Sequence, residues 1–348
     1  MGDQSKNEGL QAGRAIAALS VAYFHSYIAL RAFPETAQVP IGALANWGFL
    51  GVNFFFAISG YVICLVVSRP GFAPIPFAIR RVFRLYPMYW MTMAVVALLI
   101  AIGKYRPEPL GHFLYSMTLL PQQTPPAYDP SWTLEREMVF YALAMVIVPL
   151  GGIRALAIVL AALAVAGLYF GNPWSFHLVT STQADFLAGV LAFLARDQFR
   201  RVSTPLLTMA GVALLVYSRA HEFVFAVAIS SCLILAGMVE LRLPWQRAPL
   251  RWLVALGDAS YSIYLLHVIT FSVMAFVAAR LPLQLPEWMC EPWRALSIGV
   301  CCLISLATWR LIERPTIRFG NRLAVGGRLG TLWSREPPAV VQARSSGD

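Results

Sequence analysis

The chain has 348 residues, of which 58% are hydrophobic and only 13% are charged, and its mean hydropathy is +0.64. A soluble domain carries about 25% charged residues, so the composition excludes an ordinary soluble protein and predicts a polytopic membrane protein. The formal net charge of +10 could indicate nucleic acid as a partner. The basic residues gather on one side of the topology below, however, which indicates the lipid bilayer as the partner and no nucleic acid.

Ten apolar segments follow one another, each with about the length of a membrane-spanning helix. The predicted spans are 12–32, 44–68, 86–103, 132–150, 154–170, 182–196, 204–219, 222–240, 259–280 and 293–312. Residues 1–11 are polar and predict a cytoplasmic segment without the features of a signal peptide. We therefore expect an all-α fold with about ten transmembrane helices. Residues 12–315 form its membrane-embedded domain, and 316–348 form a basic, disordered cytoplasmic tail.

The distribution of Lys and Arg predicts the orientation of these helices. If both termini lie on one side of ten spans, that side holds 20 of the 27 basic residues. Basic residues concentrate on the cytoplasmic side of membrane proteins, so both termini are expected in the cytoplasm. The seven residues left on the outer side are Arg31, Lys104, Arg106, Arg136, Arg219, Arg280 and Arg294.

A polar face runs along the first span, where an apolar stretch separates Arg14 from His25. Eleven residues at about 100° each bring both side chains to one face, about 16 Å apart along the axis. An ionisable residue inside a membrane indicates a functional site that faces a protein interior or a water-filled cavity. A structural histidine bonded to a neighbouring helix is the other interpretation, and this stretch alone leaves both open.

A basic segment precedes the third span and ends with Arg80, Arg81 and Arg84. Arg81 and Arg84 are three residues apart and share a helix face, at the membrane level of Arg14. Guanidinium groups bind phosphates bidentately, which indicates an anion site. Anchoring by the positive-inside rule explains the same arginines without a ligand.

The fourth span begins with Trp132 and carries Glu137 and Tyr141. A carboxylate inside an apolar run is costly unless it is paired, so Glu137 is a candidate functional residue. Glu135 lies in the first turn, where a carboxylate suits the helix dipole. Trp132 and Tyr141 either belong to an aromatic belt at the membrane interface or stack on a sugar ring.

Other polar residues of the spans have a structural explanation. Asn53 and Ser59 suit close helix packing in the second span. Ser260, Tyr264 and His267 follow i, i+4, i+7 and predict an interhelical hydrogen-bond seam. The five cysteines show neither a disulfide framework nor metal-ligand spacing, so no metal is expected.

Together these segments resemble the acyltransferase-3 family of bacterial integral-membrane proteins. Members of this family O-acylate glycans, usually with acetyl groups, and the spacing is most similar to the exopolysaccharide-production branch. The blocks that carry the resemblance occur in family order: Arg14 with His25, 54–61, 80–90, 131–141, 185–189, 260–267 and 313–315.

The resemblance implies acetyl-CoA as the acyl donor and no metal. It implies that His25 is the catalytic base or a transient acyl carrier, and that Glu137 orients the imidazole or activates the acceptor hydroxyl. The phosphates of the donor would be held by Arg14, Arg80, Arg81 and Arg84. Substrate contacts are expected from Trp132, Tyr141, Asn53, Ser59, Tyr61 and His267.

We therefore expect an acyltransferase of the bacterial inner membrane. It would move an acetyl group from cytoplasmic acetyl-CoA to a hydroxyl of an exopolysaccharide, lipopolysaccharide or lipid-linked glycan, with polysaccharide export or synthesis proteins as partners. The alternative is a transporter or flippase for a glycan or small anion, in which the same polar faces line a pathway and His25 relays protons. A non-catalytic scaffold would leave Arg14, His25 and Glu137 without a role.

Overall fold

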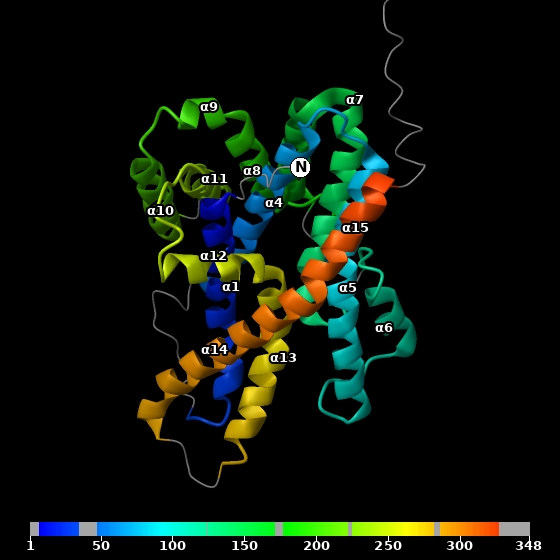
Figure 1. Ribbon diagram of the computed structural model, residues 1–348, viewed down its shortest axis with the longest axis vertical. Helices are drawn as coiled ribbons and strands as arrows, with labels where there is room; N and C mark the ends of the chain where they lie inside the picture. The colour runs from blue at the N-terminus through cyan, green and yellow to red at the C-terminus, as the bar shows by residue number, and fades with distance from the viewer. Residues whose placement is uncertain are drawn as a thin grey trace, which may run out of the picture.

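The structure is a computed structural model that describes residues 7–34, 47–122, 124–170, 177–221, 225–281 and 286–326. Within these ranges it is built of helices and contains no β-strand, which confirms the all-α prediction. Figure 1 shows the helices gathered around α1 (Glu8–His25), which runs through the middle of the bundle. Each of the ten predicted spans falls on a helical segment.

The first half of the chain supplies most of the helices that surround the site, and α13 (Ser260–Ala278) of the second half completes them. The first half contains α1 with the 3₁₀ turn η1 (Ser26–Leu30), η2 (Gly48–Leu50), α4 (Gly51–Val67), α5 (Pro74–Ala101), α6 (Leu110–Ser116), η3 (Asp129–Ser131) and α7 (Trp132–Tyr169). The second half contains α8 (Gln183–Leu194), α9 (Arg196–Phe199), α10 (Thr204–His221), α11 (Ala226–Val239), α12 (Leu250–Asp258), α13 (Ser260–Ala278), η4 (Glu287–Met289), α14 (Cys290–Thr308), the π-turn η5 (Trp309–Glu313) and α15 (Arg314–Gly326).

Five of the described segments are long and apolar enough to cross a membrane: Gly48–Val67, Pro74–Ala101, Asp129–Tyr169, Ser260–Ala278 and Glu287–Val325. Three shorter apolar helices accompany them, at Gln183–Leu194, Thr204–Ser218 and Ala226–Val239. This set of helices is typical of a multi-pass membrane protein. The number of ten spans and the placement of both termini stay predictions.

A glycine separates the two spans predicted at 132–150 and 154–170. Both lie within α7, and the helix breaks at Gly152, whose φ of 74° is a left-handed conformation that side chains disfavour. Pro149 precedes the break and removes one helical hydrogen bond. The two halves of α7 therefore pack as separate helices, as the sequence predicts.

Three regions differ from the sequence-based expectation. α5 begins at Pro74 rather than near residue 86, because proline suits the first turn of a helix. α6 and α12 were not predicted, since seven and nine residues are too short for a hydropathy signal. The tail was expected to be disordered from residue 316, but it is helical as far as Gly326. This helix, α15, packs on α5. Residues 327–348 lie outside the described residues.

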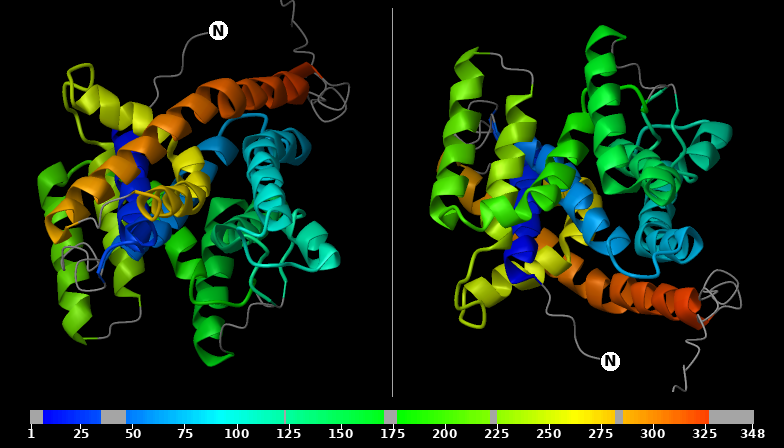
Figure 2. Two further views of the ribbon diagram at one scale, coloured as in Figure 1. Left: turned by 90° about the horizontal axis from the view of Figure 1, so that it is seen from below. Right: turned by 90° about the horizontal axis from the view of Figure 1, so that it is seen from above.

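Small residues allow α1 to lie in the centre of the bundle. It packs against α4, α12 and α13, and both views in Figure 2 show it enclosed by other helices. A Cβ atom at Gly51 of α4 or Gly257 of α12 would collide with backbone atoms of α1, so these glycines set the close approach. The side chain of Asn7 caps the helix by accepting a hydrogen bond from the Leu10 amide at 2.8 Å.

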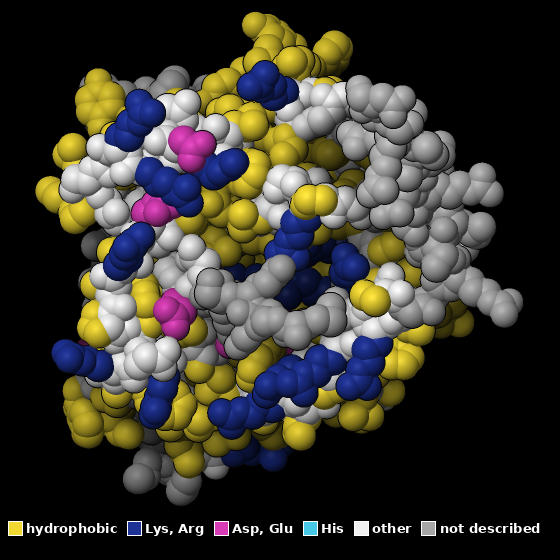
Figure 3. Space-filling model, turned by 45° about the horizontal axis from the view of Figure 1, so that its top comes forward, with side chains coloured by type: hydrophobic (Ala, Val, Ile, Leu, Met, Phe, Trp, Pro, Cys, Tyr) yellow, Lys and Arg dark blue, Asp and Glu magenta, His cyan; other side chains and the backbone are white. Residues whose placement is uncertain are grey.

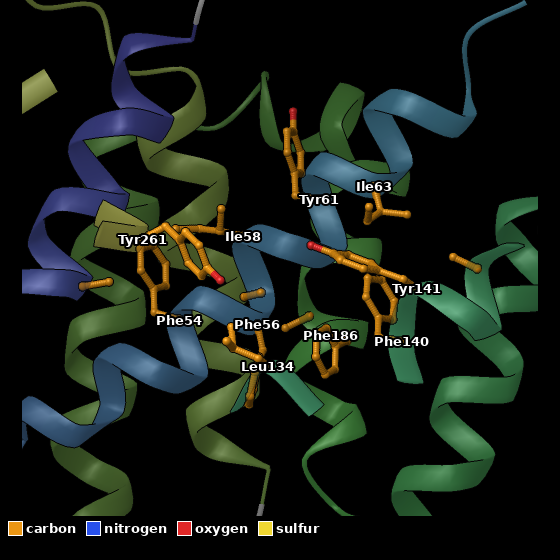
Figure 4. Close-up of a cluster of buried hydrophobic side chains, with 14 of the residues drawn as sticks. Phe54, Phe56, Ile58, Tyr61, Ile63, Leu134, Phe140, Tyr141, Phe186 and Tyr261 are labelled. Atoms are coloured by element: carbon orange, nitrogen blue, oxygen red, sulfur yellow. The ribbon is translucent and has the colours of Figure 1, made fainter. Parts of the chain in front are cut away.

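An aromatic cluster joins α4, α7 and α8 (Figure 4). Phe140 of α7 stacks on Phe186 of α8, with ring centroids 4.3 Å apart, and Phe56 of α4 lies 4.6 Å from the same ring. Stacked rings add to the stability gained by apolar burial. This cluster holds the start of α7 against α4, and both helices supply side chains to the site described below.

Replacing Gly189 with alanine is expected to destabilise the fold by about 1–3 kcal/mol, because the new methyl group overlaps the carbonyl oxygen of Ala57 where α8 crosses α4. The measurement is the thermal unfolding midpoint of the purified protein in detergent. Gly299→Ala is the matched control, since a Cβ on this exposed α14 residue meets no atom within 4 Å. An unfolding midpoint for Gly189→Ala equal to that of Gly299→Ala would contradict the packing.

Candidate functional site

Two cavities lie toward opposite ends of α1. The first has a volume of about 1080 Å³, and its polar lining includes Arg14, Ser59, Tyr61, Arg81, Arg84, Glu137, Tyr141 and Ser260. The second has a volume of about 880 Å³, and its polar lining includes His25, Arg31, Asn53, Lys104, Arg106, Asp129, Arg136 and His267. Arg14 and His25 thus project into different cavities, although both belong to one continuous helix.

α13 runs beside α1 and repeats its polar pattern. The guanidinium Nε of Arg14 donates a hydrogen bond to Ser260 Oγ at 3.1 Å, and the rings of His25 and His267 approach to 3.3 Å between Nδ1 and Nε2. The two helices therefore run parallel: Arg14 pairs with Ser260 near their first turns, and His25 pairs with His267 further along. The predicted polar stripe of α13 is an interhelical seam, and it also reaches both cavities.

Arginines dominate the inner part of the first cavity. Arg81 stacks on Phe77 and Tyr141, with its guanidinium carbon 5.1 and 5.2 Å from the two ring centroids. Its Nε atom is buried without a hydrogen-bond acceptor among the described residues, which is costly unless a ligand supplies one. Figure 3 shows the same end of the molecule, where basic side chains surround a hollow. Arg14, Arg81 and Arg84 can thus hold a polyanion such as a group of phosphates.

Glu137 balances part of this positive charge. Its carboxylate accepts a hydrogen bond from Ser59 Oγ at 2.7 Å and another from the Tyr141 hydroxyl. It interacts electrostatically with Arg14 and Arg81, so it belongs to the arginine group of the first cavity. Glu137 is not among the residues that line the cavity of His25, so a role in orienting the imidazole or in activating the acceptor hydroxyl stays a prediction.

The hydrogen bonds of His25 define which nitrogen can react. Its Nδ1 lies 3.0 Å from the carbonyl oxygen of Val21, and a carbonyl only accepts, so Nδ1 carries the proton. In a neutral imidazole the lone pair is then on Nε2. His267 has the same tautomer, because its Nδ1 lies 2.7 Å from the carbonyl oxygen of Tyr264. The His267 Nε2 lone pair therefore faces the His25 Nδ1 proton and stabilises His25 when it becomes charged.

Val52, Phe56 and Tyr264 line both cavities, and we call this shared boundary the neck. The Tyr264 hydroxyl is fixed by a bond from Thr133 at 2.9 Å and by its own bond to the carbonyl oxygen of Pro130 at 3.1 Å. A ligand anchored by the arginines must pass this neck to present a reactive group to His25.

The wall of the second cavity combines an aromatic ring with polar groups. The guanidinium carbon of Arg136 lies 4.9 Å from the ring centroid of Trp132, and the Asn53 amide donates to Asp185 at 2.8 Å. A flat ring beside hydrogen-bonding groups suits a sugar. The predicted interpretation of Trp132 as a stacking platform is compatible with this place.

A buried histidine, His177, contacts Glu135 at the start of α7. Burial, together with the nearby charge of Arg136, lowers the pKa of His177 to about 4. The imidazole is therefore neutral at pH 7, and its contact with Glu135, 3.3 Å between Nε2 and Oε2, is not an ion pair. Glu135 also accepts a hydrogen bond from Gln122 at 2.6 Å, so it has a structural role.

The structure divides the predicted site residues between the two cavities. Ser59, Tyr61 and Tyr141 line the first cavity, with Arg14, Arg81, Arg84 and Glu137. Asn53, Trp132 and His267 line the second, with His25. Arg80 lines neither cavity, although it precedes Arg81 on α5, because the helical turn points it to another face.

Sequence reasoning missed several lining residues. Tyr264 was assigned only to a seam, although its place three residues before His267 puts it on the same face. Arg31, Lys104 and Arg106 line the second cavity, but Arg31 follows η1 while Lys104 and Arg106 lie in the loop after α5, and no local pattern connects the two places. Among the described residues, no group of His, Cys, Asp and Glu is arranged to hold a metal ion.

The sequence of the chain is also similar to those of known proteins. A family model described as an acyltransferase domain matches residues 7–310. The chain belongs to the acyltransferase-3 family. It is thus an acyltransferase and a multi-pass membrane protein, as the resemblance of its motifs implied.

Two relatives of this acyltransferase cover most of its length. The exopolysaccharide production protein ExoZ of Rhizobium meliloti (strain 1021) is 28% identical over 294 residues, which is 79% of this chain and 91% of the relative. A protein of Komagataeibacter xylinus, named "Putative membrane-bound transacylase BcsY", is 26% identical over 332 residues, which is 82% of this chain and 81% of the relative. No solved structure matches the acyltransferase.

Proposed function

We propose that the protein transfers an acetyl group from cytoplasmic acetyl-CoA to a hydroxyl of a bacterial exopolysaccharide or of its lipid-linked precursor. The polysaccharide is suggested by the printed name of the relative from Rhizobium meliloti. Acetyl-CoA is suggested by the arginine group, because its nucleotide phosphates need several cations.

One observation carries this proposal: Arg14 and His25 lie on one helix but face two cavities that share a neck. The donor's phosphates bind at Arg14, Arg81 and Arg84, and its acyl thioester passes the neck. The acceptor enters the second cavity, where Trp132 stacks on a sugar ring. Both substrates then meet at His25, whose eleven-residue separation from Arg14 corresponds to about 16 Å of helix.

His25 supplies the chemistry through the lone pair of Nε2. It removes the proton of the acceptor hydroxyl while the hydroxyl oxygen attacks the thioester carbon. The new C–O bond forms, the C–S bond breaks, and the imidazolium returns its proton to the leaving thiolate. If His25 instead carries the acyl group, the same lone pair attacks the thioester first. Both routes need the tautomer that Val21 and His267 impose.

The proposed topology has ten spans with both termini in the cytoplasm of the bacterial inner membrane. It is supported by the 20:7 distribution of basic residues and by the agreement of the predicted spans with helices. In this orientation the arginine cavity opens toward the cytoplasm, where the donor is made. The His25 cavity opens toward the outer side, and residues 12–315 form the catalytic domain.

The experiment uses the purified protein in sealed proteoliposomes with acetyl-CoA labelled in the acetyl group. Incubation with an oligosaccharide acceptor is expected to yield one labelled ester for each thiol released. Mass spectrometry of the glycan and a thiol assay measure the two products. Movement of the glycan across the membrane without thiol release would favour a transporter and reject the proposal.

A further inference from the structure

The second cavity is lined by several Lys and Arg residues, although it lies on the side of the membrane where the proposed topology places few of them. The proposed topology places only seven of the 27 Lys and Arg residues on the outer side. Four of these seven, Arg31, Lys104, Arg106 and Arg136, line this cavity. Insertion disfavours basic residues on the outer side, so anchoring in the membrane does not account for their concentration here.

Carboxylates compensate two of the four cations. Arg106 contacts Glu108 at 2.6 Å and Asp129 at 2.9 Å, and of these two carboxylates only Asp129 lines the cavity. Arg136 stacks on Trp132, donates to Thr182 and interacts electrostatically with Asp185. These contacts hold both guanidinium groups in the cavity wall.

The other two cations have no such compensation. Arg31 follows η1 and Lys104 follows α5, and both side chains are exposed at the rim of the cavity. Neither forms a salt bridge with a carboxylate of the described residues. Lys104 instead stacks on Phe276 of α13, with its Nζ atom 5.4 Å from the ring centroid. Two cations near an aromatic wall suit a glycan that carries negative charge.

We propose that the acceptor is an anionic glycan, whose carboxylate or phosphate group binds between Arg31 and Lys104 while a neighbouring sugar stacks on Trp132. This inference rests on the proposed function and specifies its acceptor class. The anion has two sources with the same chemistry: an acidic sugar in the glycan, or the diphosphate of a lipid carrier. Arg31 and Lys104 are binding residues, because they touch the acceptor away from the hydroxyl that reacts.

Binding measurements test the acceptor class without relying on catalysis. Four labelled probes are compared on the full protein in zwitterionic nanodiscs: a uronic acid pentamer, its neutral methyl ester, a neutral pentasaccharide on a polyprenyl diphosphate, and the same pentasaccharide on an uncharged polyprenyl glycoside. At least one anionic probe is expected to bind about tenfold or more tightly than its neutral partner, and salt reduces the difference. The preferred pair identifies the source of the anion.

Variants connect the preference to the two cations. In the double variant Arg31→Gln with Lys104→Gln, the anionic probe and its neutral partner are expected to bind with about equal affinity. Arg31→Lys with Lys104→Arg keeps the charge and is expected to keep the preference. Arg154→Gln removes an exposed cation that lines neither cavity and serves as the control. Equal binding within both probe pairs, or a preference that survives the double glutamine variant, would overturn the proposal.

Acetyl transfer to the same four probes is followed in parallel. Absence of transfer to every probe counts against the proposed function, while the binding preference is judged from its own measurement. Efficient transfer to the neutral probes with no anionic preference in binding keeps the function and rejects the anionic acceptor.

Discussion

Replacing His25 with glutamine is expected to lower kcat for acyl transfer by about 10²–10⁴-fold, the usual contribution of a positioned general base. Glutamine keeps a donor for Val21 but has no basic nitrogen to take the acceptor's proton. The KM for acetyl-CoA is expected to change little, because the arginines lie in the other cavity. Thiol release by the purified variant, at saturating donor and acceptor, measures the effect.

His112→Gln is the matched histidine control, since His112 lies in α6 and lines neither cavity. His267→Gln is expected to give a smaller loss than His25→Gln, because His267 acts on the reaction only through its contact with the His25 ring. The unfolding midpoint of each variant separates catalysis from stability. Near-normal turnover by a folded His25→Gln protein would remove His25 from the mechanism.

Neutralising the arginines of the first cavity is expected to weaken donor binding. Arg81→Gln and Arg84→Gln should each raise the KM for acetyl-CoA by about ten- to a hundredfold, since a hydrogen bond to a charged group contributes about 1.5–3 kcal/mol. Turnover at saturating donor should fall much less, because neither residue lines the cavity of His25. Initial rates across a range of acetyl-CoA concentrations separate the two parameters.

Arg80→Gln provides a close control for these variants. Arg80 is adjacent to Arg81 on α5 and carries the same charge, but it does not line the first cavity. Its KM for acetyl-CoA should stay within about twofold of the unmodified protein, as expected for a surface charge. An equal rise in KM for all three variants would indicate a general effect of net charge instead of a phosphate site.

Features carried by one helix were predictable from the sequence. The spans follow from continuous apolar stretches, and Arg14 and His25 share a face because helical periodicity fixes their relation. The break at Gly152 was also predictable, since two apolar stretches flank a pair of glycines. These inferences need no knowledge of how helices pack.

Features that join distant segments were beyond the sequence. The cavity that Glu137 faces was not predictable, because only the packing of α7 on α4 places its carboxylate with Arg14 and Arg81. The His25–His267 pair joins residues 242 positions apart. No periodicity within α13 distinguishes a seam from the wall of a cavity.

The neck between the cavities has an electrical consequence. When water fills both cavities, the membrane potential falls mainly across the short distance at Val52, Phe56 and Tyr264. In the proposed orientation an acetyl group passes outward and a proton passes inward in its place, so donor and acceptor each keep their charge and no net charge crosses this field. A potential of 100 mV, which acts with about 2.3 kcal/mol on each charge that crosses it, therefore leaves the equilibrium of acetyl transfer unchanged. Acetylation would reach the same extent on an energised and on a de-energised membrane.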